Sequence, residues 1–204
     1  NVTDSTSLIY MNNLKTEITS FLGGRDANGL SNGTSSVLVQ TFAVSGNYLY
    51  VGKDANSTAC SQTVGGAIGC ELMVFDISST TNPIYRAGRD VSGSSNGTGA
   101  LLIYSLKVVG DYLFVGKNAD ATNACSQTSG SVGATACELM VFDISSTTNP
   151  IYRAGRDVSG SSNGSGGVAI RGLALDYYTG DYLYVAKNGD ATSCSQTVGS
   201  ATGC

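Results

Sequence analysis

The chain has 204 residues, of which 13% are charged and 41% hydrophobic, and its formal net charge is −4. This composition is typical of a globular protein and not of a disordered one. The acidic balance excludes the clustered Lys and Arg with which nucleic-acid-binding proteins contact phosphates. No apolar run approaches the roughly 18 residues that a transmembrane helix needs, and no signal peptide opens the chain. The first residue is Asn1, which indicates a processed chain or a piece of a longer one.

One unit occurs three times along the chain. The segment CELMVFDISSTTNPIYRAGRDVSGSSNG at 70–97 recurs without a change at 137–164, and a degenerate copy, LIYMNNLKTEITSFLGGRD, lies at 8–26. This copy aligns without a gap with residues 72–90 and shares Leu, Gly, Arg and Asp with them. Repeats of this length predict stacked equivalent units. We therefore predict one repeat domain spanning 1–204, with units of approximately 1–70, 71–137 and 138–204.

The middle unit contains four short strand-like runs. The first two are Leu72–Ile77 and Ile84–Ala87, joined by a polar connection that ends in Asn-Pro. Leu101–Val109 and Tyr112–Lys117 follow, separated by Gly-Asp, which is typical of a two-residue hairpin turn. The same Gly-Asn or Gly-Asp hairpin is predicted before YLYVGK, at 46–47, and before YLYVAK, at 180–181.

These runs predict an all-β fold, because no segment has a sustained period of 3.6 residues. Four strands per unit and polar turns favour a β-propeller-like array of three four-stranded antiparallel blades. A β-solenoid is the alternative, although its coils usually have shorter and more uniform strands.

The motifs LMVFDISSTTNP at 72–83 and VVGDYLFV at 108–115 resemble the LVIVD-type repeats of bacterial and archaeal surface propellers. In those repeats an apolar run ends in Asp, a Ser/Asn-Pro turn follows, and a Gly-Asn hairpin comes later. The resemblance implies a secreted or cell-surface propeller, and it carries no catalytic residue over to this chain. The long segment at 118–136, which ends just before Cys137, departs from the family pattern.

Six cysteines fall into three pairs, one in each unit. The repeat favours the pairing in which every unit closes its own loop, and this pairing indicates an oxidising, extracellular compartment. A zinc site is disfavoured, because the chain has no histidine and no CxxC. The predicted disulfides are Cys60–Cys70, Cys125–Cys137 and Cys194–Cys204.

Five N-x-Ser/Thr sequons make covalent N-glycans a prediction for a secreted chain. Three of them occupy the same loop in the three units. The candidate acceptors are Asn1, Asn32, Asn56, Asn96 and Asn163.

Loops rich in side-chain oxygens raise the possibility of calcium, which prefers oxygen ligands. None matches the D-x-[DN]-x-[DN]-G pattern, and Asp, Asn and Ser also populate turns for their own hydrogen bonds. We therefore predict no metal and no cofactor, with calcium as the alternative. The loops begin at Asp54, Asn118 and Asn188, and others follow Asp26, Asp90 and Asp157.

The absence of histidine removes the commonest general base, so we predict no catalytic residue and no enzyme activity. Glu71 and Glu138, each beside a cysteine, are expected at solvated strand edges. An Arg-Asp pair recurs in every unit, and we expect it to join neighbouring blades. The arginines are Arg25, Arg89 and Arg156.

The order of the strands bears on assembly. Two outer strands at 8–23 precede the first hairpin, and the hairpin within Leu173–Lys187 lacks an outer pair after it. A strained three-bladed ring, a longer tandem array, or strand exchange between the chain ends of successive molecules would satisfy this order.

We predict a non-enzymatic extracellular or cell-surface structural protein, a fibre or filament subunit that forms a homo-oligomer or helical homopolymer by head-to-tail strand complementation. The alternative is an adhesive or glycan-binding propeller acting through its disulfide-bounded loops.

Overall fold

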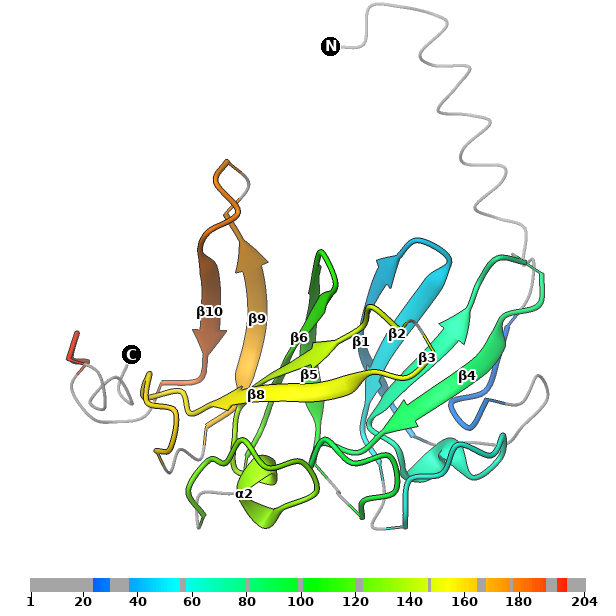
Figure 1. Ribbon diagram of the computed structural model, residues 1–204, viewed down its shortest axis with the longest axis horizontal. Coiled ribbons are helices and arrows are strands. Elements are labelled where there is room, and N and C mark those ends of the chain that lie inside the picture. The colour runs from blue at the N-terminus through cyan, green and yellow to red at the C-terminus, as the bar shows by residue number, and fades with distance from the viewer. Residues whose placement is uncertain are drawn as a thin grey trace, which may run out of the picture.

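The computed structural model describes residues 24–29, 37–55, 58–79, 81–98, 101–119, 123–146, 148–164, 168–176, 178–189 and 194–197. Within these residues the chain forms ten strands in three antiparallel sheets, which confirms the predicted all-β, propeller-like fold. Figure 1 shows the sheets side by side in a row, with β4 at one side and β10 at the other.

Two sheets have four strands each, in sequential order. Blade 1 consists of β1 (Val39–Ser45), β2 (Tyr48–Lys53), β3 (Leu72–Asp76) and β4 (Ile84–Arg89). Blade 2 consists of β5 (Ile103–Val109), β6 (Tyr112–Lys117), β7 (Leu139–Asp143) and β8 (Ile151–Arg156).

The third sheet has two strands among the described residues: β9 (Ile170–Leu175) and β10 (Leu183–Lys187). Two short helices lie in the cysteine-bounded loops: the 3-10 helix η1 (Ala67–Gly69) and α2 (Val132–Thr135). Each blade therefore begins with a hairpin and adds an outer pair, as the order of the runs predicts. Strand β5 lies next to both β1 and β9, so the first strands of successive sheets are neighbours.

The hairpin turns follow the local sequence in both blades. In blade 1, Ser45 pairs with Tyr48, so Gly46 and Asn47 form a two-residue turn. Gly46 has φ of 55° and no non-glycine residue among those described has a positive φ, which identifies a type II′ turn. Gly110 has the same φ in the equivalent turn of blade 2.

The two-residue turn predicted at 180–181 is wrong. Leu175 pairs with Leu183, so a longer loop over 176–182 connects β9 to β10. The side chain of Asp176 accepts hydrogen bonds from the backbone N–H groups of Tyr178 (3.1 Å) and Thr179 (3.3 Å). These bonds stabilise a local Asx-type turn before the Gly-Asp pair is reached.

The largest apolar core lies between the two blades. Side chains of blade 1 such as Tyr50 and Val74 pack with residues of blade 2 such as Leu113 and Phe142 in one buried cluster. Strand β3 is buried at four consecutive positions, because both of its faces are covered. The stability of a blade therefore depends on its neighbours in the row as well as on its own hydrogen bonds.

Candidate functional site: the blade-to-blade interface

Arg89, at the end of β4, reaches the connection between β7 and β8. Its Nε donates to the carbonyl of Pro150, and a terminal nitrogen donates to Oδ1 of Asn149. Arg25 makes the same two contacts with the carbonyl of Pro83 and with Oδ1 of Asn82 in blade 1. The predicted role of the recurring arginine between blades is confirmed at Arg89, and Arg25 makes the same contacts with blade 1 from the segment that precedes it. The third arginine, Arg156, is exposed.

The loop after this arginine forms a second contact with the next blade. The carbonyl of Ser92 accepts a hydrogen bond from the N–H of Gly130 at 2.8 Å. Gly93 has φ of 83°, and a Cβ added there would lie 2.7 Å from Cβ of Tyr152. This close approach and the positive φ both require glycine. Gly29 lies against Tyr85 in the same way.

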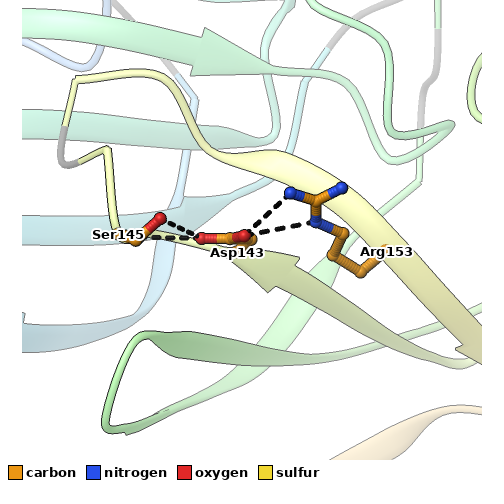
Figure 2. Close-up of polar contacts among 3 residues, drawn as sticks. All are labelled: Asp143, Ser145 and Arg153. Carbon is orange, nitrogen blue, oxygen red and sulfur yellow. Dashed lines mark hydrogen bonds and ion pairs between the residues drawn. The ribbon is translucent and has the colours of Figure 1, made fainter.

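Arg89 binds the connection between β7 and β8 that contains Asn149 and Pro150. A polar cluster stabilises the start of this connection, at the end of β7 (Figure 2). Oδ1 of Asp143 accepts hydrogen bonds from the N–H and the hydroxyl of Ser145, at 2.9 and 2.6 Å. Its Oδ2 forms an ion pair with Arg153 at 2.9 Å. The bonds from Ser145 and then Arg153 lower the pKa of this carboxyl to about 2. Asp76 has an equivalent cluster in blade 1.

Each disulfide loop is attached to the outer strand of its own blade. The Gln62 side chain donates to the carbonyl of Gly88 at 2.6 Å and accepts from the N–H of the same residue at 3.0 Å. Gln127 makes the same pair of bonds with Gly155 in blade 2. A Cβ at Gly88 would lie 2.3 Å from Sγ of Cys70. The loop thus occupies part of the strand edge, which would otherwise be open to pairing.

The cysteine-bounded loops contain the disulfides expected from the repeat. Cys60 is bonded to Cys70, and Cys125 to Cys137. Cys194 is described, and its predicted partner Cys204 lies outside the described residues.

Two sequon asparagines can be located in the structure. Asn96 and Asn163 are both exposed, in the equivalent loops after blades 1 and 2. The other candidate acceptors, Asn1, Asn32 and Asn56, lie outside the described residues. Glycosylation at any of these positions stays a prediction.

The expectation of solvated strand edges for Glu71 and Glu138 is wrong, because both residues are fully buried. The loop after the outer strand contacts each carboxylate, because the N–H of Val91 donates to Oε2 of Glu71 and that of Val158 donates to Oε2 of Glu138, both at 3.1 Å. The N–H of Lys53 donates to the carbonyl of Glu71 at 2.9 Å, which places the two residues on neighbouring strands. Lys53 and Lys117 are fully buried as well, and sequence reasoning missed them. A lysine ends each of the three hairpins, after Gly in two of them and after Ala in the third, and this recurrence was the available signal.

Burial shifts the pKa values of these groups toward neutrality. Nζ of Lys117 donates to the carbonyls of Thr135 (2.6 Å) and Asn118 (3.2 Å). Desolvation lowers the pKa of Lys117 to about 7. Desolvation, with a further contribution from the charge of Asp157, raises the pKa of Glu138 to about 7.

The oxygen-rich loops mostly satisfy their own backbone. Oδ1 of Asp90 accepts from the N–H of Ser92 at 2.7 Å, and Oδ1 of Asp157 accepts from that of Ser159 at the same distance. Across the residues that the structure describes, no group of three or more His, Cys, Asp and Glu is placed to hold a metal ion.

The face of a blade that is directed toward the preceding blade is termed its leading face, and the opposite one its trailing face. On the leading face of blade 2, Ile103 is 1% exposed and Leu106 is 8% exposed, because blade 1 covers them. Their equivalents in blade 1, Val39 and Phe42, are 55% and 69% exposed. They border an apolar groove of about 300 Å³, which is lined also by Leu49, Val51, Met73, Phe75 and Pro83 of blade 1 and by residues 24–27 of the preceding segment.

On the trailing faces, the exposed side chain belongs to the last sheet of the row instead of the first. Tyr50, on the trailing face of blade 1, is fully buried, whereas its equivalent in β10, Tyr184, is 61% exposed. The described residues thus form an open row with an apolar surface at each end.

Comparison with known proteins identifies part of one repeat. Residues 38–57, which include β1 and β2, match the family model of the LVIVD repeat, and this match confirms the predicted resemblance. A search of the curated proteins and a search of the solved structures found no match. No helix among the described residues has the length and apolar character to cross a membrane.

Proposed function

We propose that this chain is a non-enzymatic, extracellular structural repeat protein whose copies assemble head to tail into a surface fibre or filament. The observation that carries the proposal is the exposure of Phe42 and Val39 on a face whose equivalent in blade 2 is covered. Large apolar side chains that cluster on one exposed face mark an interaction surface. The blade 1–blade 2 interface shows what kind of surface fits such a face.

The matching surface is the hairpin β9–β10. It presents Tyr184 where blade 1 presents the buried Tyr50. If the hairpin of one copy docks on the leading face of blade 1 in a second copy, both exposed surfaces become buried. The contact is heterologous, so repetition produces a ring or a helical filament.

The segment at 8–26 fits the same arrangement, because it aligns with residues 72–90, which contain β3 and β4. We propose that it supplies the outer pair for the hairpin β9–β10 of the neighbouring copy, a form of strand addition. Arg25, at the end of this segment, already contacts blade 1 as Arg89 contacts blade 2. The junction would then continue the contacts seen within the chain.

An extracellular location is supported by the disulfides, which persist in oxidising compartments. The exposed sequons at Asn96 and Asn163 are placed where N-glycans would be tolerated. The proposal assigns no catalytic role and no cofactor. It is favoured over glycan binding through the disulfide loops, because Gln62 and Gln127 attach these loops to the blades.

Sedimentation velocity of the oxidised chain over a range of concentrations, followed by negative-stain microscopy, tests this proposal. We expect concentration-dependent linear or ring-shaped assemblies, and we expect Phe42→Asp to leave monomers because it places a charge in the junction. Val132→Asp, on the exposed surface of α2, serves as the control and should assemble normally. A wild-type chain that stays monomeric at all concentrations, or a Phe42→Asp variant that assembles like it, would overturn the proposal.

A further inference from the structure

Each interface between successive sheets places a glycine of one sheet against an isoleucine of the next. A Cβ added to Gly52 in β2 would lie 2.5 Å from Cγ2 of Ile103 in β5. A Cβ added to Gly116 in β6 would lie 2.5 Å from Cγ2 of Ile170 in β9. Real Cβ atoms do not approach other carbons so closely, so neither interface has room for a methyl group at the glycine.

The two outer surfaces of the row depart from this pattern in opposite directions. Ala186 in β10 occupies the position of the two glycines, so the trailing surface has gained a carbon. Val39 in β1 occupies the position of the two isoleucines, so the leading surface has lost one. An Ala–Val pair holds as many side-chain carbons as a Gly–Ile pair. Where these two surfaces meet, the two changes therefore compensate each other in volume.

The hairpin itself has room for the methyl group of Ala186. Its cross-strand partner is Gly172, and a Cβ there would lie in ordinary contact with the Ala186 methyl, at 3.5 Å. In β1–β2 the corresponding pair is Thr41 and Gly52, where the threonine fills the space. Within its own sheet, Ala186 therefore has enough space. On its other side it would face a residue of a following blade, as Gly52 faces Ile103.

We infer that Ala186 of one copy packs against Val39 of a second copy, in the register that joins Gly52 to Ile103 within the chain. This inference rests on the proposed head-to-tail assembly and specifies its partner as another copy of this chain. A partner that presented isoleucine at this position, as blade 2 and β9 do, would overpack against the Ala186 methyl.

The test uses two substitutions that change the side-chain volume on opposite sides of the junction. Sedimentation velocity measures the self-association of each variant. Val39→Ile creates an overpacked Ala–Ile junction, and we expect self-association about tenfold weaker than that of the wild type. Ala186→Gly creates a Gly–Val junction with a small void, and we expect self-association about threefold weaker. Both positions are exposed in the single chain, so thermal unfolding of the Val39→Ile monomer should not change, and that of the Ala186→Gly monomer should shift only by the small backbone cost of glycine in a strand.

An equimolar mixture of the two variants separates contact between copies from any effect within one chain. In the mixture, junctions alternate between Gly–Ile and Ala–Val, so we expect assembly to return to the wild-type level. Val132→Ile provides the same chemical change on the exposed α2 and should assemble normally without a partner variant.

If the wild-type chain assembles but mixing restores nothing, the Ala186–Val39 contact is wrong and head-to-tail assembly stands. If single variants assemble as well as the wild type, the contact is likewise overturned. If the wild-type chain does not assemble at all, the proposed function and this inference fail together.

Discussion

Blades 1 and 2 have the same fold and identical sequences in their outer strands, yet the exposure of their leading faces differs. Leu106 of blade 2 is buried under blade 1, whereas its equivalent Phe42 lies open to solvent. The hydrogen-bond register around the two residues is the same, because Leu106 pairs with Val115 and Phe42 with Val51. The strand pairing of a blade is thus the same with or without a described neighbour on its leading face, whereas the burial of that face depends on the neighbour.

The largest expected effect is on monomer stability, when Leu106 on the covered leading face of blade 2 and Phe42 on the exposed leading face of blade 1 are each changed to alanine. Leu106→Ala should lower the free energy of unfolding by about 3 kcal/mol, because it removes buried carbons and leaves a cavity. Phe42→Ala should change the stability of the monomer by about 0.5 kcal/mol or less, because its side chain is already in water. Urea unfolding at a concentration below assembly measures both. Equal losses in the two variants would show that the monomer covers Phe42.

The recurring arginine offers a second contrast. Arg89→Met should cost about 2 kcal/mol, because its hydrogen bonds to Asn149 and Pro150 are lost from a buried position. Arg156→Met should leave monomer stability unchanged, because Arg156 is exposed. Thermal unfolding monitored by circular dichroism provides the comparison. A similar shift in both melting temperatures would contradict it.

The buried charges predict a dependence on pH. The pKa of Glu138 rises from 4.5 to about 7 on folding, so the folded protein binds the proton more tightly. The free energy of unfolding should therefore fall as the pH rises from about 4.5 to about 7, by on the order of 1 kcal/mol. The pKa of Lys117 falls from 10.5 to about 7, so stability should increase again as the pH rises from about 7 to about 10.5.

Substitution of Glu138 separates its contribution to the pH dependence of stability from that of Glu71 in blade 1. Glu138→Gln should remove part of the fall between pH 4.5 and 7 and leave the part that comes from Glu71 in blade 1, whose pKa is also raised. Asp76 and Asp143 do not disturb this window, because their pKa values are lowered to about 2. Urea unfolding at several pH values measures the effect, and parallel profiles for the variant and the wild type would rule it out.

The smallest expected effect on the monomer concerns the segment before blade 1. Gly24 aligns with Gly88 and Gly155, where a Cβ would collide with a disulfide sulfur. Gly24→Ala should leave monomer stability unchanged and weaken assembly about tenfold, if this segment meets the Cys194 loop of another copy. Gly23→Ala is the matched control, because Ala87 and Ala154 occupy the equivalent position. Light scattering should distinguish the two, and equal assembly would exclude this contact.

Much of the fold could be predicted from local pattern. The runs at 72–77 and 112–117 became strands at nearly the predicted residues, and the Gly46 and Gly110 turns formed as two-residue hairpins. The turn at 180–181 could not be predicted in this way, because the side chain of Asp176 begins a competing turn earlier in the chain. The cysteine pairing of the first two loops followed from the repeat itself.

The candidate site was less accessible to such reasoning. A glutamate next to a cysteine has the same local sequence whether it is solvated or enclosed, and Val91, which donates a hydrogen bond to the buried carboxylate of Glu71, lies 20 residues further along the chain. The sequence shows that Ala186 replaces the glycine of the other hairpins and that Val39 replaces the isoleucine. Only the tertiary contact between Gly52 and Ile103 shows that these two positions face each other across an interface.

The repeat, the strand order, the hairpin turns at Gly46 and Gly110 and the first two disulfides follow from the amino-acid sequence, because they depend on residues that are near one another in the chain. Tertiary packing sets which faces are covered, which charges are buried and which surfaces remain open. Those properties depend on what packs against a side chain from a distant part of the row, so blades with the same fold and different neighbours acquire different surfaces.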